Sequence, residues 1–291
     1  MTTKAPPARL FVIRARKVPF AVVFRRGPSK LVRLIGWNTE TDVFEGGHWL
    51  KGRIYERRCD LSPNGRYLIY FAADHKSPMY SWTAISKPPW LTAISLWRKG
   101  DCWGGGGLFA TANTVWLNHP TARLAPGFEP CPRLTVKAAG GSGEDQPIYG
   151  MHLKRDGWIL VQEGKYQHNS SRKSRETGVS FTFDPPDIWE RVSGSGAGLR
   201  MVTHGFGEQD GDWYVVTHEV AMPGGETVSM GRTDWADWDR NGDLLYAKDG
   251  KLFRLPPNHR GLFDPEERRE LADFNSDRFR AIPPPDDAKR W

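Results

Sequence analysis

Pairs of Asn-Gly or Asp-Gly recur just before apolar, β-type runs, and this pattern constrains the fold more than any other feature. The pairs are Asn64-Gly65, Asp156-Gly157, Asp210-Gly211, Asn241-Gly242 and Asp249-Gly250. Such residues tolerate the positive φ angles of a type I′ turn, so each pair predicts a two-residue hairpin. A chain punctuated in this way should fold mainly as antiparallel strands.

The segments between these turns are short and rich in Val, Ile and aromatic residues, as strands are. The clearest are residues 10–15, 20–26, 30–37, 66–72, 91–97, 114–118, 158–162, 213–220, 243–247 and 251–255. No helical period extends over ten or more residues between positions 9 and 255. The sequence therefore predicts an all-β domain over residues 1–260.

The turn markers also form a rhythm, if the glycine run Gly104–Gly107 is counted as a divergent copy. Most gaps between markers are about forty to fifty residues, the length of a four-stranded propeller blade. "LSPNGRYLIYF" (61–71) resembles the SPDG-type hairpin of TolB-like and WD-repeat-like β-propellers, and "WDRNGDLLYAKDGKLFRL" (238–255) resembles the same unit with its next hairpin. The resemblance implies a five-bladed β-propeller, with six blades or two packed β-sandwiches as alternatives.

The end of the chain has a different pattern. Asp264 is suited to cap a helix, Pro265 fits its first position and Glu267 completes a capping box. We expect a short C-terminal helix within residues 263–274. A proline-rich, extended tail follows it, so residues 261–291 form a region separate from the propeller.

The charge of the chain is uneven. The net charge is +7, and residues 1–60 alone hold thirteen Lys and Arg against five acidic residues. A basic face of this kind suits an acidic protein partner, nucleic acid or an anionic membrane. We expect the main contact at Arg14, Arg16, Arg25 and Arg26.

No specific catalytic motif is present: the sequence has no GxSxG, HExxH, Walker loop or GxGxxG. A propeller channel could gather scattered carboxylates for glycoside hydrolysis, and the thirteen tryptophans would suit sugar binding. The candidate acids are Asp60, Asp74, Glu163 and Asp234. This carbohydrate-directed role is an alternative to a non-enzymatic one.

Metal and cofactor sites have weak signals. His204 and His218 flank the Asp210-Gly211 turn, and a suitable register would pair them near His152 or Glu219. Residues 237–248 match the start of an EF-hand loop, but its twelfth position is Lys248 instead of a glutamate. The run WGGGG (103–107) leads into a strand, whereas a phosphate cradle leads into a helix. We expect no cofactor.

Three widely spaced cysteines, Cys59, Cys102 and Cys131, suit a reducing compartment. The N-terminal residues have no signal-peptide pattern, and no apolar stretch approaches eighteen residues. The sequence thus predicts a cytoplasmic, non-enzymatic scaffold without a membrane span. It would present one propeller face to a protein partner, with nucleic-acid binding through the basic N-terminal blade as a further alternative.

Overall fold

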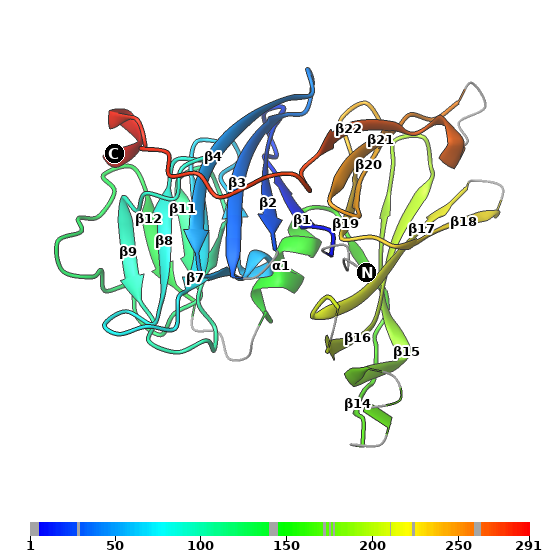
Figure 1. Ribbon diagram of the computed structural model, residues 1–291, viewed down its shortest axis with the longest axis horizontal. Helices are drawn as coiled ribbons and strands as arrows, with labels where there is room; N and C mark the ends of the chain where they lie inside the picture. Colours follow the sequence, from blue (N-terminus) through cyan, green and yellow to red (C-terminus); the bar gives the residue numbers. More distant parts are fainter. Residues whose placement is uncertain are drawn as a thin grey trace, which may run out of the picture. The chain divides into compact units, whose positions relative to one another are not determined.

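The computed structural model describes residues 6–27, 30–139, 145–170, 173–174, 176, 178–209, 211–222, 225–258 and 263–291. It is an all-β structure, with 47% of its residues in strands. The strands form several sheets, each built from consecutive segments of the chain and almost entirely antiparallel (Figure 1). The predicted β class is confirmed at this level.

The first two sheets come from the N-terminal third of the chain. Sheet A has the order β1-β2-β3-β4, and sheet B has the order β5-β7-β8-β9 with β6 also paired to β7. The strands of sheet A are β1 (Arg9–Arg14), β2 (Phe20–Arg26), β3 (Leu31–Asn38) and β4 (Val43–Lys51). Those of sheet B are β5 (Arg53–Ile54), β6 (Asp60–Leu61), β7 (Leu68–Ala73), β8 (Ser81–Ser86) and β9 (Ser95–Arg98). A 3-10 turn, η1 (Glu56–Arg58), joins β5 to β6.

The remaining strands form three more sheets. Sheet C consists of β10 (Gly107–Phe109), β11 (Thr114–Leu117) and β12 (Thr135–Ala138), with β11 and β12 parallel. Sheet D has the order β13-β15-β16-β17-β18, with β14 also paired to β15. Its strands are β13 (Ile159–Gln162), β14 (Tyr166–His168), β15 (Val179–Val192), β16 (Gly198–Glu208), β17 (Tyr214–Ala221) and β18 (Thr227–Arg232). Sheet E consists of β19 (Trp235–Trp238), β20 (Leu244–Lys248), β21 (Lys251–Leu255) and β22 (Arg269–Asp273).

The chain divides into two compact units. Unit 1 contains Met1–Asp156 and Phe274–Trp291, and unit 2 contains Gly157–Asp273. Sheets A, B and C belong to the first unit, and sheets D and E belong to the second. Within the described ranges, no helix is long and apolar enough to cross a membrane.

Apolar side chains from consecutive strands make the core of unit 1. One cluster joins sheets A and B through fully buried residues such as Phe24, Leu34 and Leu68. A second cluster joins sheets B and C around Ile69, Trp97 and Phe109. Burial of large side chains of this kind is the main favourable contribution to folding. Buried tryptophans, each at most 9% exposed, lie in both units: Trp37 and Trp97 in unit 1, and Trp158, Trp189, Trp235 and Trp238 in unit 2.

The helix expected within residues 263–274 does not form. Asp264 does cap a turn, because its Oδ1 accepts a hydrogen bond from the Glu266 amide at 3.0 Å. The turn, however, is only the 3-10 segment η2 (Pro265–Glu267), and the chain then pairs with β21 as strand β22. So short a helix has little intrinsic stability and only a small apolar edge to bury, whereas the edge of sheet E offers backbone partners.

The proline-rich tail belongs to unit 1 and packs against its surface. The tail crosses β3 and β4 and ends in the short 3-10 segment η3 (Asp286–Lys289) (Figure 1). The Lys87 side chain donates to the Asp287 carbonyl at 2.6 Å, and the rings of Tyr67 and Trp291 are 5.4 Å apart. The segment 274–291 is thus anchored along its length.

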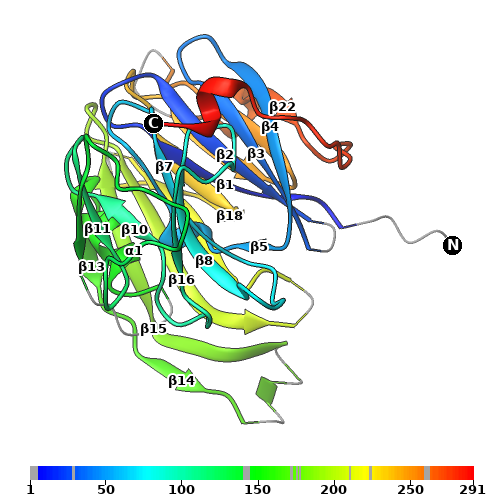
Figure 2. The same ribbon diagram turned by 90° about the vertical axis from the view of Figure 1, so that its left-hand side faces the viewer.

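The Asp156-Gly157 pair ends a helix instead of forming the expected hairpin. The helix is α1 (Ile148–Arg155), which the sequence pattern does not predict, and it lies beside β10 (Figure 2). Asp156 closes the helix, and Gly157 follows at φ +88°. A glycine with positive φ directly after a helix is a common stop signal. The Asp-Gly pair therefore ends a helix here instead of forming a hairpin turn.

Only one of the described Asn-Gly and Asp-Gly pairs has the two-residue form that we expected. Asp249 and Gly250 both have positive φ (53° and 75°), and the flanking residues Lys248 and Lys251 pair directly. At Asn64-Gly65 and Asn241-Gly242 only the glycine has positive φ, and the loops are longer. Asp210 lies outside the described residues, so its turn stays a prediction.

Candidate functional site

The four arginines predicted as a partner contact lie in different surroundings. Arg25 is only 1% exposed, and its Nε donates to the Phe274 carbonyl at 3.1 Å. Arg26 forms an ion pair with Glu56. In the register of β1 and β2, Arg26 pairs with Arg9, five residues from Arg14, which is roughly 16 Å along a strand.

Arg16 is turned toward sheet C. Its Nη2 donates to the Phe109 carbonyl at 2.7 Å, and burial, together with the Arg155 charge, lowers its pKa. Because Arg25 is buried and donates to the Phe274 carbonyl, it is an interior residue that stabilises the docked tail. A contact through Arg14, Arg16 and Arg26 stays a prediction.

A different basic and aromatic surface does exist on sheet A. Cross-strand pairing places Leu10, Arg25, Arg33 and Trp49 in one row across β1, β2, β3 and β4. Arg25 and Arg33 each lie 5.7 Å from the centre of the Trp49 ring. Gly46 makes room for this arrangement, since a Cβ there would stand 2.0 Å from Arg33 Nη2.

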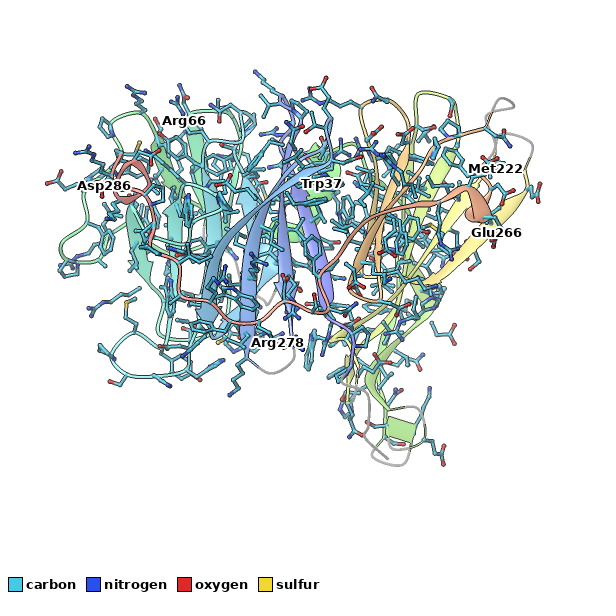
Figure 3. The ribbon with its side chains drawn as sticks, turned by 45° about the horizontal axis from the view of Figure 1, so that its top comes forward. Trp37, Arg66, Met222, Glu266, Arg278 and Asp286 are labelled. Atoms are coloured by element: carbon cyan, nitrogen blue, oxygen red, sulfur yellow. The ribbon has the colours of Figure 1, made fainter. Side chains whose placement is uncertain are left out.

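The tail passes over this row and borders an open hollow beside it. Arg33 Nη1 donates to Asp277 Oδ2 at 2.6 Å, and the Ala8 amide donates to Asn275 Oδ1 at 2.8 Å. Phe279 lies edge-on to Trp49, with ring centres 6.1 Å apart. The hollow has a volume of about 390 Å³ and is lined by Arg33, Trp49, Ser276, Asp277, Arg278, Phe279 and Arg280. Figure 3 shows Arg278 on the tail segment that borders it. We call it the strap hollow.

Unit 2 presents a surface of another kind, at an edge of sheet D. β13 is the edge strand of the sheet, and β14 pairs with β15 farther along the same side (Figure 2). Ile159 is 64% exposed and Val161 is 53% exposed, with Leu160 between them at 36%. Tyr166 on β14 is 67% exposed. An edge strand carries backbone groups without a strand partner, and natural proteins usually protect such edges with charges or cover.

The candidate acid Asp60 is engaged in a buried ion pair. Its side chain is 1% exposed and accepts hydrogen bonds from Arg155 and, at 2.6 Å, from the Phe109 amide. Burial by itself would lower the pKa of Arg155, but the charges and hydrogen bonds of Asp60 and Asp156 outweigh it and raise that pKa. Asp74, the other candidate in unit 1, accepts from the Lys76 amide within a turn. The ion pair indicates a structural role for Asp60, whereas a role for Asp74 stays a prediction.

His152 lies next to this ion pair on α1. Its Nε2 is 4.0 Å from Asp60 Oδ2 and has no hydrogen-bond partner among the described residues. Burial, opposed in part by the Asp60 charge, lowers the pKa of His152, so the neutral ring is favoured. His152 belongs to unit 1, whereas His204 and His218 belong to unit 2.

His204 and His218 do not pair in the register that would let them share a metal ion. His218 pairs with Met201, and a bulge between Thr203 and Gly205 leaves His204 out of the ladder. His204 Nε2 lies 2.8 Å from Thr217 Oγ1, and His218 Nδ1 lies 2.6 Å from Thr233 Oγ1. Threonine hydroxyls thus partner both rings. Across the described ranges, no group of three or more His, Cys, Asp or Glu side chains could hold a metal ion.

The stretch 237–247 is a hairpin between β19 and β20. Asp239 Oδ1 accepts from the amides of Asn241 and Asp243, at 2.7 and 2.9 Å. Asp239 and Asp243 also form ion pairs with Arg254. The acidic residues that suggested a calcium loop therefore close a turn and neutralise a buried arginine.

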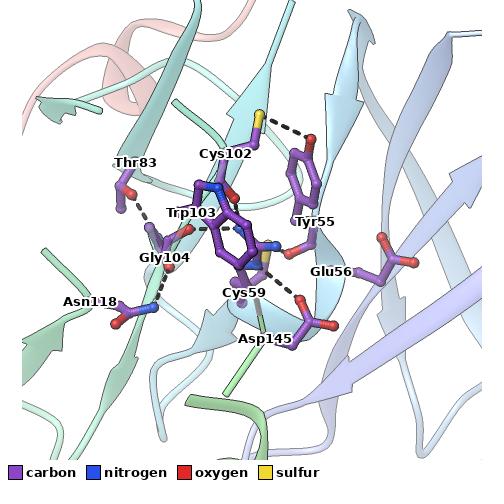
Figure 4. A network of polar contacts seen from close by, with 12 residues as sticks. Tyr55, Glu56, Cys59, Thr83, Cys102, Trp103, Gly104, Asn118 and Asp145 are labelled. Atoms are coloured by element: carbon purple, nitrogen blue, oxygen red, sulfur yellow. Dashed lines mark hydrogen bonds and ion pairs between the residues drawn. The ribbon is translucent and has the colours of Figure 1, made fainter. Parts of the chain in front are cut away.

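The glycine run 104–107 and the preceding Cys102 supply backbone carbonyls to the guanidinium of Arg58. Figure 4 shows Cys102, Gly104 and Asp145 in this polar network. Arg58 Nη1 donates to the carbonyls of Cys102 and Gly104, both at 2.7 Å, and its Nε donates to Asp145 at 2.9 Å. A Cβ on Gly105 would stand 2.4 Å from the Phe71 ring, and one on Gly106 would stand 1.9 Å from the Arg58 carbonyl. Glycine is required at these positions because the backbone packs closely against Phe71 and Arg58. The run therefore forms a turn and not a phosphate cradle.

Comparison with known proteins gives little to set beside this geometry. No family model matches the chain, and no curated protein matches it. Among solved structures, the chain is similar to the uncharacterized protein lmo1340 from Listeria monocytogenes EGD-e, with 9% identity over 93% of this chain and 84% of that chain. The TM-score is 0.31, too low to support an argument.

Two of the surfaces described above were missed by sequence reasoning. The sequence contains the apolar run at 159–161, but a run of that kind usually marks a buried strand, so its exposure could not be foreseen. The strap hollow brings Arg33 and Trp49 together with residues 276–280, which are distant in sequence. A basic and aromatic composition in the tail, as in Arg278-Phe279-Arg280, was the only local signal.

Proposed function

We propose that this protein is a non-enzymatic, cytoplasmic interaction scaffold that binds a protein partner through the edge of sheet D. One observation carries the proposal: β13 is an edge strand whose three apolar side chains, Ile159 to Val161, are between 36% and 64% exposed. Such an edge suits β-strand addition, in which an extended partner segment pairs with the free backbone groups. The apolar side chains then add specificity and buried area.

The proposed architecture behind this edge is the five-bladed propeller over residues 1–260. Two features support it: each of the five sheets consists of consecutive strands, and strand order within each sheet largely follows the sequence. Sheet C, with its parallel pair β11 and β12, departs from a regular blade. An experimental structure with five sheets around one axis would establish the propeller, and any other packing of the sheets would refute it.

A cytoplasmic location fits the state of the cysteines. Cys59, Cys102 and Cys131 are all free thiols, and Cys59 and Cys131 are buried. Burial raises the pKa of the Cys59 thiol, which disfavours the reactive thiolate. Fractionation of the native host tests the location directly.

The binding proposal is tested with the full chain as bait in a lysate of the native host. Ile159→Lys places a charge on the edge strand, and Val43→Lys is the matched control because Val43 is 63% exposed on β4 of unit 1. We expect the unmodified chain and the Val43 variant to recover one partner in stoichiometric amount, and the Ile159 variant to lose it.

Two results would contradict the proposal. One is recovery of no protein partner by the unmodified chain. The other is a partner that the Ile159 variant retains, because the contact would then lie elsewhere. Sedimentation of the purified chain covers the remaining case: self-association abolished by Ile159→Lys would make the occupant a second copy, not a different protein.

A further inference from the structure

Unit 1 carries a second candidate binding surface, the strap hollow between sheet A and the tail. Its lining combines three guanidinium groups with two aromatic rings, and its volume of about 390 Å³ lies within the range of small-ligand sites. The edge of sheet D proposed above for protein binding is on unit 2, so the two surfaces belong to different units.

The charge of the hollow favours an anion. Arg278 and Arg280 are both exposed, on either side of Phe279. The Arg33 side chain is 21% exposed, and Lys51 adds a cation 4.5 Å from the centre of the Phe279 ring. Asp277 is the only acidic residue in the lining, and it is already paired with Arg33 at 2.6 Å. The balance of charge in the lining is therefore positive.

One cation in the hollow is incompletely satisfied. Asp277 accepts from Arg33 Nη1, while the buried Arg33 Nε has no hydrogen-bond partner among the described residues. The neighbouring Arg25 is in the same condition at Nη2. Buried donors without partners are uncommon, and guanidinium groups bind phosphate oxygens especially well.

The aromatic rings indicate which anion fits best. Phe279 is 44% exposed, and the rings of Trp49 and Phe279 stand edge to face beside the arginines. Single-stranded nucleic acids offer both features that such a surface recognises, since their phosphates pair with cations and their unstacked bases stack on rings. An acidic peptide would use the cations alone. We propose that the strap hollow binds single-stranded nucleic acid, with a phosphate at Arg278 and Arg280 and a base against Phe279.

The test is fluorescence anisotropy of labelled oligo(dT) and oligo(U) with the full chain over a series of salt concentrations. We expect affinity to fall linearly with salt on logarithmic axes, and the variant Arg278→Glu/Arg280→Glu to reduce that slope by about 1.4, the value for two phosphate contacts on a single strand. The matched control is Arg123→Glu/Arg133→Glu, which changes the net charge equally at two exposed positions of unit 1. The control should keep most of the affinity.

A second pair of variants tests the ring. Phe279→Ala should weaken binding roughly ten-fold, while Phe279→Trp should preserve it, because a base stacks on either ring. Since Phe279 is 44% exposed, neither change should unfold the chain, and urea midpoints would verify this. If Arg278 is needed to hold the tail in place, the double variant would disturb the fold. The single variant Arg280→Glu then tests the loss of affinity without changing Arg278.

Several results would overturn the proposal. The first is no binding of either oligonucleotide at low salt. The second is binding that the Arg123/Arg133 control weakens as much as the hollow variant. The third is binding of poly-glutamate or duplex DNA as tight as that of the oligonucleotides and unchanged by Phe279→Ala. The hollow would then recognise negative charge without a base.

Discussion

Arg155, at the end of α1, donates hydrogen bonds to both carboxylate oxygens of Asp60 on β6. The distances are 2.5 Å from Nη1 to Oδ2 and 3.1 Å from Nη2 to Oδ1. Asp60 is 1% exposed and the Arg155 side chain is 15% exposed, so the pair is largely removed from water. The two parallel hydrogen bonds hold α1 against β6.

The first prediction concerns this ion pair. Arg155→Met removes the charge while keeping much of the side-chain volume, and it leaves the Asp60 carboxylate buried without its partner. Loss of one member of a buried pair costs about 3–5 kcal/mol, so we expect the free energy of unfolding to fall by that order. Urea denaturation measures the change. Arg123→Met, at an exposed position, should cost less than about 0.5 kcal/mol. Equal midpoints for the two variants would refute a stabilising role.

The second prediction concerns stability against pH, through His119. His119 is 4% exposed, its Nε2 lies 2.8 Å from Thr83 Oγ1, and burial lowers its pKa to about 4. Between the ordinary pKa of 6.5 and about 4, the unfolded chain binds a proton that the folded chain does not. The contribution of His119 is thus complete above pH 6.5, is lost progressively as the pH falls, and stays lost below about 4.

The corresponding experiment compares urea midpoints at pH 7 and pH 5. We expect His119→Gln to lose about 2 kcal/mol less than the unmodified chain over this interval, because glutamine has no proton to gain. His75→Gln, at an exposed position, is the control. The comparison of variants isolates His119 from other groups that titrate in the same range. Identical losses for all three chains would show that His119 is protonated equally in the folded and unfolded states.

The third prediction concerns the glycine run around Arg58. Gly106 and Gly127 have similar backbone angles, at φ +75° and +84°, but only Gly106 is crowded: its Cβ would stand 1.9 Å from the Arg58 carbonyl, whereas nothing lies within 4 Å of one on Gly127. Gly127→Ala should cost about 1–2 kcal/mol for the left-handed conformation alone. Gly106→Ala should cost clearly more, because backbone must shift. Thermal denaturation of both variants gives the comparison, and equal costs would mean that the loop yields easily.

The all-β class was predictable because alternating apolar runs and turn residues are local properties of the sequence. The helix α1 was missed because eight residues are too few to show a clear helical repeat of apolar side chains. Gly150 also interrupts that repeat. The prediction of a helix at the end of the chain failed for a different reason. The cap at Asp264 is local and present, but the choice of strand over helix after it depends on the distant partner β21.

The candidate sites were harder to predict, because exposure depends on tertiary packing. Arg25 and Arg26 are neighbours in sequence, yet alternation along β2 places Arg25 under the tail and Arg26 beside Glu56. Cross-strand register also decides whether the two histidines face each other, since one bulge removes His204 from the ladder. Single-residue shifts of this kind move side chains to another face, and the sequence does not encode them visibly.

The fourth prediction uses the two turn pairs that looked alike in sequence. Asp249 has φ +53° in a two-residue turn, whereas Asn241 does not have a positive φ. Asp249→Ala should therefore lower the free energy of unfolding by about 1–2 kcal/mol, while Asn241→Ala at its exposed position should change it little. Asp249→Asn is the second control, because asparagine tolerates the left-handed conformation and should retain most of the stability. Urea midpoints of the three variants test this order. If Asn241→Ala proved as costly as Asp249→Ala, the two turns would share one backbone geometry, as their sequences first suggested.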